Sequence, residues 1–128
     1  MKLVHHKGLT LERWAEVPFC ERMANVGSEV HRAISWRDRN PLYSQQALER
    51  ALELLDLSLL TVVGQESRLR ELARLREALV DYFVYDNQYG SSDALWQKYF
   101  GAFTHAAAVA RHGLSTDVSQ RSAPERGQ

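Results

Sequence analysis

Apolar residues recur along this chain at alternating steps of three and four, and this pattern extends over four long segments. Such spacing places the apolar side chains on one face of a helix that packs against its neighbours. The apolar stripes are, in chain order, Phe19, Met23, Val26, Val30 and Ala33; Leu48, Leu52, Leu55, Leu59 and Val62; Leu69, Leu72, Leu75, Leu79 and Phe83; and Leu95, Tyr99, Ala102, Phe103, Ala106, Val109 and Ala110. The pattern predicts four amphipathic helices and no strand.

Residues that favour helix ends mark the first boundaries. Thr10 can N-cap a short lead-in helix over residues 11–17, because its hydroxyl can accept a backbone N–H of the first turn. Pro18 suits the first position of the next helix, where a missing N–H costs nothing. Asn40, followed by proline, is the expected N-cap of the second long helix, with Ser44 as an alternative start.

The later boundaries are predicted in the same way. Gly64 is expected to end the second long helix and Ser67 to cap the third. Ser92 or Asp93 is expected to cap the fourth helix after a loop rich in polar and glycine residues. Gly113 is the expected end of that helix, since glycine commonly follows a helix C-terminus.

Four helices of similar length joined by short loops predict an all-α fold, an antiparallel up-down-up-down four-helix bundle. We expect an N-terminal extension with a short lead-in helix over residues 1–17 and the bundle over 18–113. Residues 114–128 contain almost no apolar side chains and are predicted to form a disordered C-terminal tail.

Composition narrows the classes of function. The 128 residues are enough for one domain, and 16 basic residues balance 16 acidic ones, which disfavours nucleic acid and anionic membranes as partners. Cys20 is the only cysteine, so a disulfide within the chain is excluded. There is no apolar run long enough for a membrane span and no signal-peptide pattern, and we therefore expect a cytoplasmic protein.

No catalytic or cofactor motif is present. A di-iron centre in a helical bundle needs Glu-x-x-His repeats, which this chain lacks, and it also lacks phosphate-binding loops, nucleophile elbows and zinc spacings. We therefore expect no cofactor, no metal site and no enzymatic activity. Asp56, flanked by leucines, is expected to pair with an arginine or to form a cap.

The first long helix has two distinct borders beside its apolar stripe. Cys20, Ala24 and Gly27 form a border of small residues. Because glycine inside a helix costs about 1 kcal/mol relative to alanine, Gly27 indicates close approach of a neighbouring helix. The alternative interpretation is a notch that accepts a ligand.

The other border carries Glu29, Arg32 and Trp36. Glu29 can pair with Arg32, and Arg32 can lie over Trp36 at helical spacing. Trp36 suits either a subunit interface or packing against Trp14 of the lead-in helix. The full set of candidate interface residues is Trp14, Glu29, Arg32, Trp36 and Trp96.

Two further clusters are candidate binding sites. Arg68, Arg70, Arg74 and Arg76 on the third long helix are candidate nucleic-acid contacts, although Glu71 and Glu77 lie among them. The aromatic-rich loop after that helix is a candidate small-molecule pocket, with structural packing of the loop as the alternative. Its residues are Asp81, Tyr85, Asp86, Asn87 and Tyr89.

Three blocks of sequence resemble those of a known group of proteins. They are MANVGSEVHRAISW at 23–36, ALERALELLDLSL at 47–59 and LWQKYFGAFTHAA at 95–107. The group consists of uncharacterised bacterial proteins similar in fold to the four-helix-bundle proteins encoded in 23S rRNA intervening sequences. The resemblance covers about residues 10–112. It implies a homo-oligomeric ring of five subunits and a link to RNA, whereas the Ser-Ile-x-x-Asn-Ile-Ala-Glu-Gly stretch of the intervening-sequence proteins is missing here.

The sequence thus supports two hypotheses about function. The first is a non-enzymatic bundle that assembles with itself and serves as an interaction scaffold, because apolar faces are wide and catalytic groups are missing. The second is a nucleic-acid-binding module that uses the four arginines, which the neutral net charge disfavours.

Overall fold

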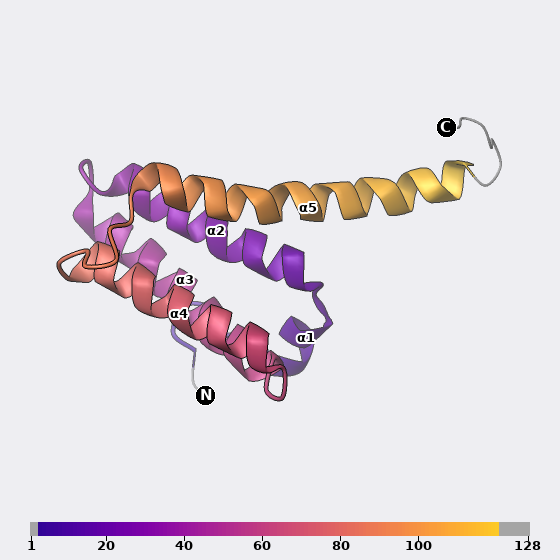
Figure 1. Ribbon diagram of the computed structural model, residues 1–128, viewed down its shortest axis with the longest axis horizontal. Helices are drawn as coiled ribbons and strands as arrows, with labels where there is room; N and C mark the ends of the chain where they lie inside the picture. Colours follow the sequence, from indigo (N-terminus) through magenta and orange to yellow (C-terminus); the bar gives the residue numbers. More distant parts are fainter. Residues whose placement is uncertain (1–2, 121–128) are drawn as a thin grey trace.

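The computed structural model describes residues 3–120 of the chain and the side chains of residues 3–112. The described part is all-helical, as predicted, with four long helices after a short one (Figure 1). The helices are α1 (Leu11–Glu16), α2 (Phe19–Trp36), α3 (Pro41–Thr61), α4 (Glu66–Val84) and α5 (Asp93–Gln120).

Successive long helices run in opposite directions, which confirms the up-down-up-down arrangement (Figure 1). Helix α2 is central, because it packs closely against both α3 and α5. Helices α1 and α4 pack on α3. The side between α4 and α5 is more open, and a groove lined by residues of both helices lies there.

Three helices begin as the sequence predicts. The Thr10 hydroxyl accepts the backbone N–H of Arg13 at 3.2 Å, and the Asn40 side-chain oxygen accepts that of Tyr43 at 3.2 Å. The hydroxyl of Ser92 accepts a backbone N–H from the first turn of α5 at 3.1 Å. Each oxygen satisfies a donor that has no partner within its own helix.

Other predictions about the helix starts are wrong. Pro18 is the N-cap of α2 and not its first residue. Ser67 lies inside α4, whose N-cap is Gln65, without a side-chain hydrogen bond. The Ser44 hydroxyl donates to the Ala33 carbonyl at 2.6 Å, so this serine joins α2 to α3 and caps neither.

The predicted end of the second long helix is confirmed, whereas that of the fourth is wrong. Gly64 follows α3 with φ +93, a conformation that glycine adopts without a Cβ clash. Helix α5 does not end at Gly113 but continues to Gln120, so the first part of the predicted tail is helical. Residues 121–128, the rest of that tail, lie outside the described residues.

The core lies between the four long helices. Its largest fully buried side chains include Met23, Leu55, Leu72 and Leu79. The predicted apolar stripes of α2 and α4 supply most of the buried side chains of those helices, and the stripe of α3 supplies part of them. The predicted stripe of α5 is wrong, because Trp96, Phe100 and Ala107, which lie outside it, are the residues that α5 contributes to the core. Helix α1 is attached to this core through Trp14, whose indole N–H donates to the Ser58 hydroxyl at 2.8 Å. The lead-in helix therefore packs as part of the bundle.

Helices α2 and α5 approach each other closely at Gly27. A Cβ atom built on Gly27 would lie 2.6 Å from Cβ of Phe100 and 2.9 Å from its Cγ, far inside ordinary contact distance. The prediction that a neighbouring helix approaches closely at Gly27 is therefore confirmed. Cys20 and Ala24, on the same border of α2, are half-buried.

We expect the substitution Gly27→Ala to lower the free energy of unfolding by about 1–3 kcal/mol, because the added methyl group forces the two helices apart. Gly101 is the matched control: it is helical and adjacent to Phe100, but a Cβ there meets nothing within 4 Å. Gly101→Ala should raise stability by up to about 1 kcal/mol through helix propensity. Urea denaturation of both variants measures the contrast, and a stabilised Gly27→Ala protein would contradict the close contact.

Candidate functional site

Two of the predicted interface residues belong to the core. Trp14 is 4% exposed and Trp96 is 7% exposed, and both are members of the main apolar cluster. Trp96 stacks on Phe100, with ring centroids 6.1 Å apart and an angle of 27° between the planes. Both tryptophans therefore pack within the chain's own core.

The other three interface candidates are engaged within the chain. Glu29 pairs with Arg32 at 3.1 Å, as predicted, and also with Arg50 of α3 at 2.9 Å. Trp36 is half-buried, and the guanidinium group that lies over its ring, 4.4 Å from the centroid, is that of Arg39 rather than Arg32. Trp36 packs edge-on against Tyr43 of α3 and not against the lead-in helix.

The arginines on α4 do not form a free basic surface. Arg76 pairs with Asp56 at 2.7 Å, which confirms the predicted arginine partner of that aspartate. Arg70 lies 3.6 Å from the Glu66 carboxylate one turn earlier. Because these positive charges face carboxylates of the same chain, less charge is available for phosphate groups of a nucleic acid.

Arg68 and Arg74 differ in their surroundings. The guanidinium carbon of Arg68 lies 3.7 Å from the centroid of the Phe19 ring, a cation–π geometry. Its contact with Glu71 is long, at 4.0 Å. Arg74 lines the groove between α4 and α5, together with Arg70 and Glu71. The four arginines therefore do not act as one stripe.

The aromatic loop after α4 is held together by hydrogen bonds among its own residues. The Asp81 carboxylate accepts the backbone N–H groups of Gln88 and Tyr89 at 2.9 and 3.0 Å. Asn87 exchanges two hydrogen bonds with the backbone of Ser91. The remaining members of the predicted cluster, Tyr85, Asp86 and Tyr89, are exposed. The structure therefore supports the alternative of a structural loop and does not bring these five side chains together as a pocket.

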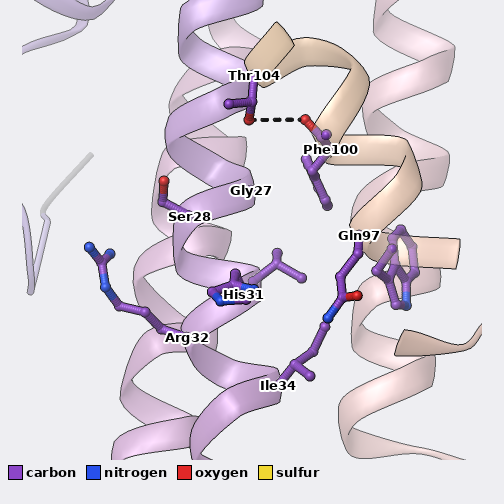
Figure 2. Close-up of a pocket in the computed structure, with 11 residues that line it drawn as sticks. Gly27, Ser28, His31, Arg32, Ile34, Gln97, Phe100 and Thr104 are labelled. Atoms are coloured by element: carbon purple, nitrogen blue, oxygen red, sulfur yellow. Dashed lines mark hydrogen bonds between the residues drawn. The ribbon is translucent and has the colours of Figure 1, made fainter. Parts of the chain in front are cut away.

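A groove of about 320 Å³ lies between α2 and α5, beside the contact of Gly27 with Phe100 (Figure 2). His31 from α2 and Gln97 from α5 line it. It corresponds to the notch considered for Gly27, which Phe100 fills at the level of the glycine itself.

The polar side chains of this groove are not arranged for catalysis. The Ser28 hydroxyl donates to the Ala24 carbonyl at 3.2 Å. The Thr104 hydroxyl donates to the Phe100 carbonyl at 3.2 Å (Figure 2). Among the described residues, His31 has no hydrogen-bonded carboxylate or hydroxyl partner. A nucleophile activated by a base is therefore not assembled in this groove.

Helix α5 carries an exposed apolar surface that sequence reasoning did not identify. Leu95 and Val109 are 56% and 54% exposed. Another groove, of about 600 Å³, runs along this surface and is separate from the grooves between α4 and α5 and between α2 and α5. Its walls are Ser91, Leu95, Trp96, Lys98, Tyr99, Ala102 and Phe103. The apolar spacing of α5 was visible in the sequence, but its exposure was not.

A polar cluster fixes the start of α5. Arg37, after the C-terminus of α2, pairs with Asp93 at 2.7 Å, and the Tyr82 hydroxyl donates to the same carboxylate. The hydrogen bond from Arg37 is the main reason that the pKa of Asp93 is lowered. Asp93, predicted as an alternative cap, thus joins α2, α4 and α5.

Glu53 on α3 has the most clearly perturbed carboxylate. Its carboxylate accepts hydrogen bonds from the backbone N–H groups of Val4, His5 and His6. It is also hydrogen-bonded to Nδ1 of the His6 ring, at 2.8 Å. Burial by itself would raise the pKa of Glu53, but these hydrogen bonds outweigh it and lower the pKa to about 2. The carboxylate holds the N-terminal segment on α3, which is a structural role.

The described residues hold no group of three or more His, Cys, Asp or Glu side chains placed to bind a metal ion. Within residues 3–120, none of the helices combines the length and the apolar content needed to cross a membrane. In comparisons with known proteins, no family model, curated protein or solved structure matches this chain. The relation to intervening-sequence proteins is therefore a hypothesis that depends on the three sequence blocks.

We expect acid to release the N-terminal segment through Glu53. Its folded pKa of about 2 lies below the value of about 4.3 for an unperturbed glutamate, so its contribution is complete above pH 4.3 and lost as the pH falls towards 2. At pH 7, Glu53→Gln should lower the free energy of unfolding by about 1–3 kcal/mol.

Urea denaturation of both proteins between pH 7 and pH 2.5 measures this effect. The difference between wild type and Glu53→Gln should shrink steadily as the pH falls below about 4.3. A difference that stays constant over the whole range would show that the Glu53 charge has no part in holding the segment.

Proposed function

We propose that this protein is a non-enzymatic helical-bundle scaffold that assembles with copies of itself through α5. The observation that carries the proposal is the exposed apolar stripe on α5, where Leu95 and Val109 are each more than half exposed. Apolar side chains that remain in water at helical spacing favour association, because their burial lowers the free energy.

The stripe has the spacing of a helix–helix contact. Leu95, Ala102 and Val109 are exposed, and Tyr99 and Ala106 between them are partly buried. The five residues follow one another at steps of four, three, four and three, and at about 100° per residue they lie within one narrow face. The alanines at its centre have short side chains, which allow a second helix to approach closely.

The stripe is also self-complementary. Ala102 lies midway between Leu95 and Val109 in the sequence. In an antiparallel pair of α5 helices with a two-fold axis at Ala102, Leu95 of one chain would face Val109 of the other. Both apolar residues would then be covered by the same contact.

The alternative functions receive less support from the structure. Arg70 and Arg76 face carboxylates on α4 and α3, which weakens the case for nucleic-acid binding. Among the described residues, the one histidine that lines the groove between α2 and α5, His31, has no partner that could complete an acid–base pair. Both observations favour an interaction scaffold over a nucleic-acid-binding module or an enzyme.

We expect Ala102→Glu to dissociate the assembly, because it would bring two carboxylates together at the two-fold axis, where they repel each other and lose their hydration. The matched control is Ala108→Glu, an identical change at an exposed position on a different face of the same helix. Light scattering coupled to size-exclusion chromatography, at micromolar concentration, gives the mass of each protein.

Wild type and Ala108→Glu should have a multiple of the mass of one chain, whereas Ala102→Glu should have the mass of one chain. The multiple separates a two-fold pair from the ring of five that the sequence resemblance implies. A wild-type protein with the mass of one chain at this concentration contradicts self-assembly, and an unchanged mass of Ala102→Glu places the contact elsewhere.

A further inference from the structure

Arg22 is a buried cation with no carboxylate partner among the described residues. It is 8% exposed, one turn into α2. Its Nη1 donates one long hydrogen bond, at 3.5 Å, to the Trp14 carbonyl, and its buried Nε has no acceptor among the described residues. No described carboxylate lies within ion-pair distance of it. An uncompensated buried charge is costly, so this guanidinium group favours an incoming anion.

A second guanidinium group lies near the same aromatic ring as that of Arg22. The guanidinium carbons of Arg22 and Arg68 lie 5.7 and 3.7 Å from the centroid of the same ring, that of Phe19. Burial and, to a lesser extent, the charge of Arg68 lower the pKa of Arg22. The nearest carboxylate to Arg68, that of Glu71, is 4.0 Å away. Two like charges therefore act on each other near one ring, with little compensation from the described carboxylates.

The two helices that carry these arginines begin at the same end of the bundle (Figure 1). The N-cap residues, Pro18 for α2 and Gln65 for α4, make no side-chain capping hydrogen bond. Uncapped helix N-termini carry partial positive charge and backbone N–H groups without acceptors. They add to the positive potential around Arg22 and Arg68.

The acidic residues in the first turns of these helices have other partners. Glu21 lies 3.8 Å from Arg111 of α5, and Glu66 lies 3.6 Å from Arg70. Neither carboxylate is within ion-pair distance of Arg22. The local excess of positive charge is therefore not cancelled from within the described part of the chain.

We propose that Arg22 and Arg68 bind a small oxyanion, a phosphate or carboxylate group, at the end of the bundle where α2 and α4 begin. An oxyanion between the two guanidinium groups neutralises their repulsion and offers the Nε of Arg22 the acceptor that it lacks. The partly exposed side chain of Arg68 gives the anion access from solvent. The site is independent of the α5 stripe and of self-assembly.

The test uses the full-length protein with inorganic phosphate as the probe and acetate as the carboxylate probe, both at constant ionic strength. We expect a saturable rise of the melting temperature and a saturable shift of the Arg22 Nε–H resonance in a nitrogen–proton NMR spectrum. The response to acetate relative to phosphate then identifies which oxyanion the site prefers.

Arg22→Met and Arg68→Gln should each weaken phosphate binding at least about tenfold, since each removes a charged hydrogen-bond donor. Without phosphate, Arg22→Met should be as stable as wild type or more so, because it removes an unpaired buried charge. The matched control is Arg39→Gln, which removes an arginine stacked on Trp36 at the other end of α2. It should bind phosphate as wild type does.

Phosphate also stabilises proteins without a specific site, and that effect is equal in all variants. An equal rise of the melting temperature in wild type, Arg22→Met and Arg68→Gln would overturn the proposal, as would an Arg22 Nε–H resonance that phosphate leaves unmoved. If Arg22→Met does not fold, the comparison of Arg68→Gln with Arg39→Gln decides the question by the same criterion.

Discussion

The close contact between Gly27 of α2 and Phe100 of α5 is the constraint on which the rest of the structure depends. Helix α2 packs against α3 on one side and α5 on the other, and only a residue without a Cβ allows α5 to lie so near. This contact places Trp96 and Phe100 in the core. It also sets the start of α5 where Asp93 can reach Arg37 and Tyr82.

The packing of α5 against α2 determines which side chains of α5 remain exposed. With Trp96 and Phe100 in the core, residues on another face of the helix, including Leu95 and Val109, remain exposed. Leu95 and Tyr99 lie along a groove that is lined by Ser91 and by residues of α5. The proposed assembly surface is thus a result of how α5 is held against α2.

Charge in this protein is mostly balanced within the chain. Glu29 of α2 pairs with Arg50 of α3, and Asp56 of α3 pairs with Arg76 of α4. Glu53 of α3 accepts hydrogen bonds from the N-terminal segment and so holds it on that helix. These contacts account for charged residues that resemble binding groups when they are considered in the sequence alone. Arg22 is the exception, because its charge is buried without a carboxylate partner among the described residues.

Helix type and order could be predicted from the sequence, because apolar periodicity is a local property of the chain. The caps Thr10 and Asn40 were predictable for the same reason, since each acts on its own first turn. Ser67 and Gly113 were not, because several residues near a helix end compete as caps, and glycine weakens a helix without forbidding its continuation.

The sequence by itself determined the four amphipathic helices, their antiparallel order and the need for close packing at Gly27, because each follows from spacing along the chain. Only the tertiary structure decided that Trp14 and Trp96 are buried, that the stripe of α5 is exposed, and that Arg22 and Arg68 meet at Phe19. The physical reason is that periodicity shows which face of a helix is apolar, whereas burial and charge pairing depend on which distant segment packs against it.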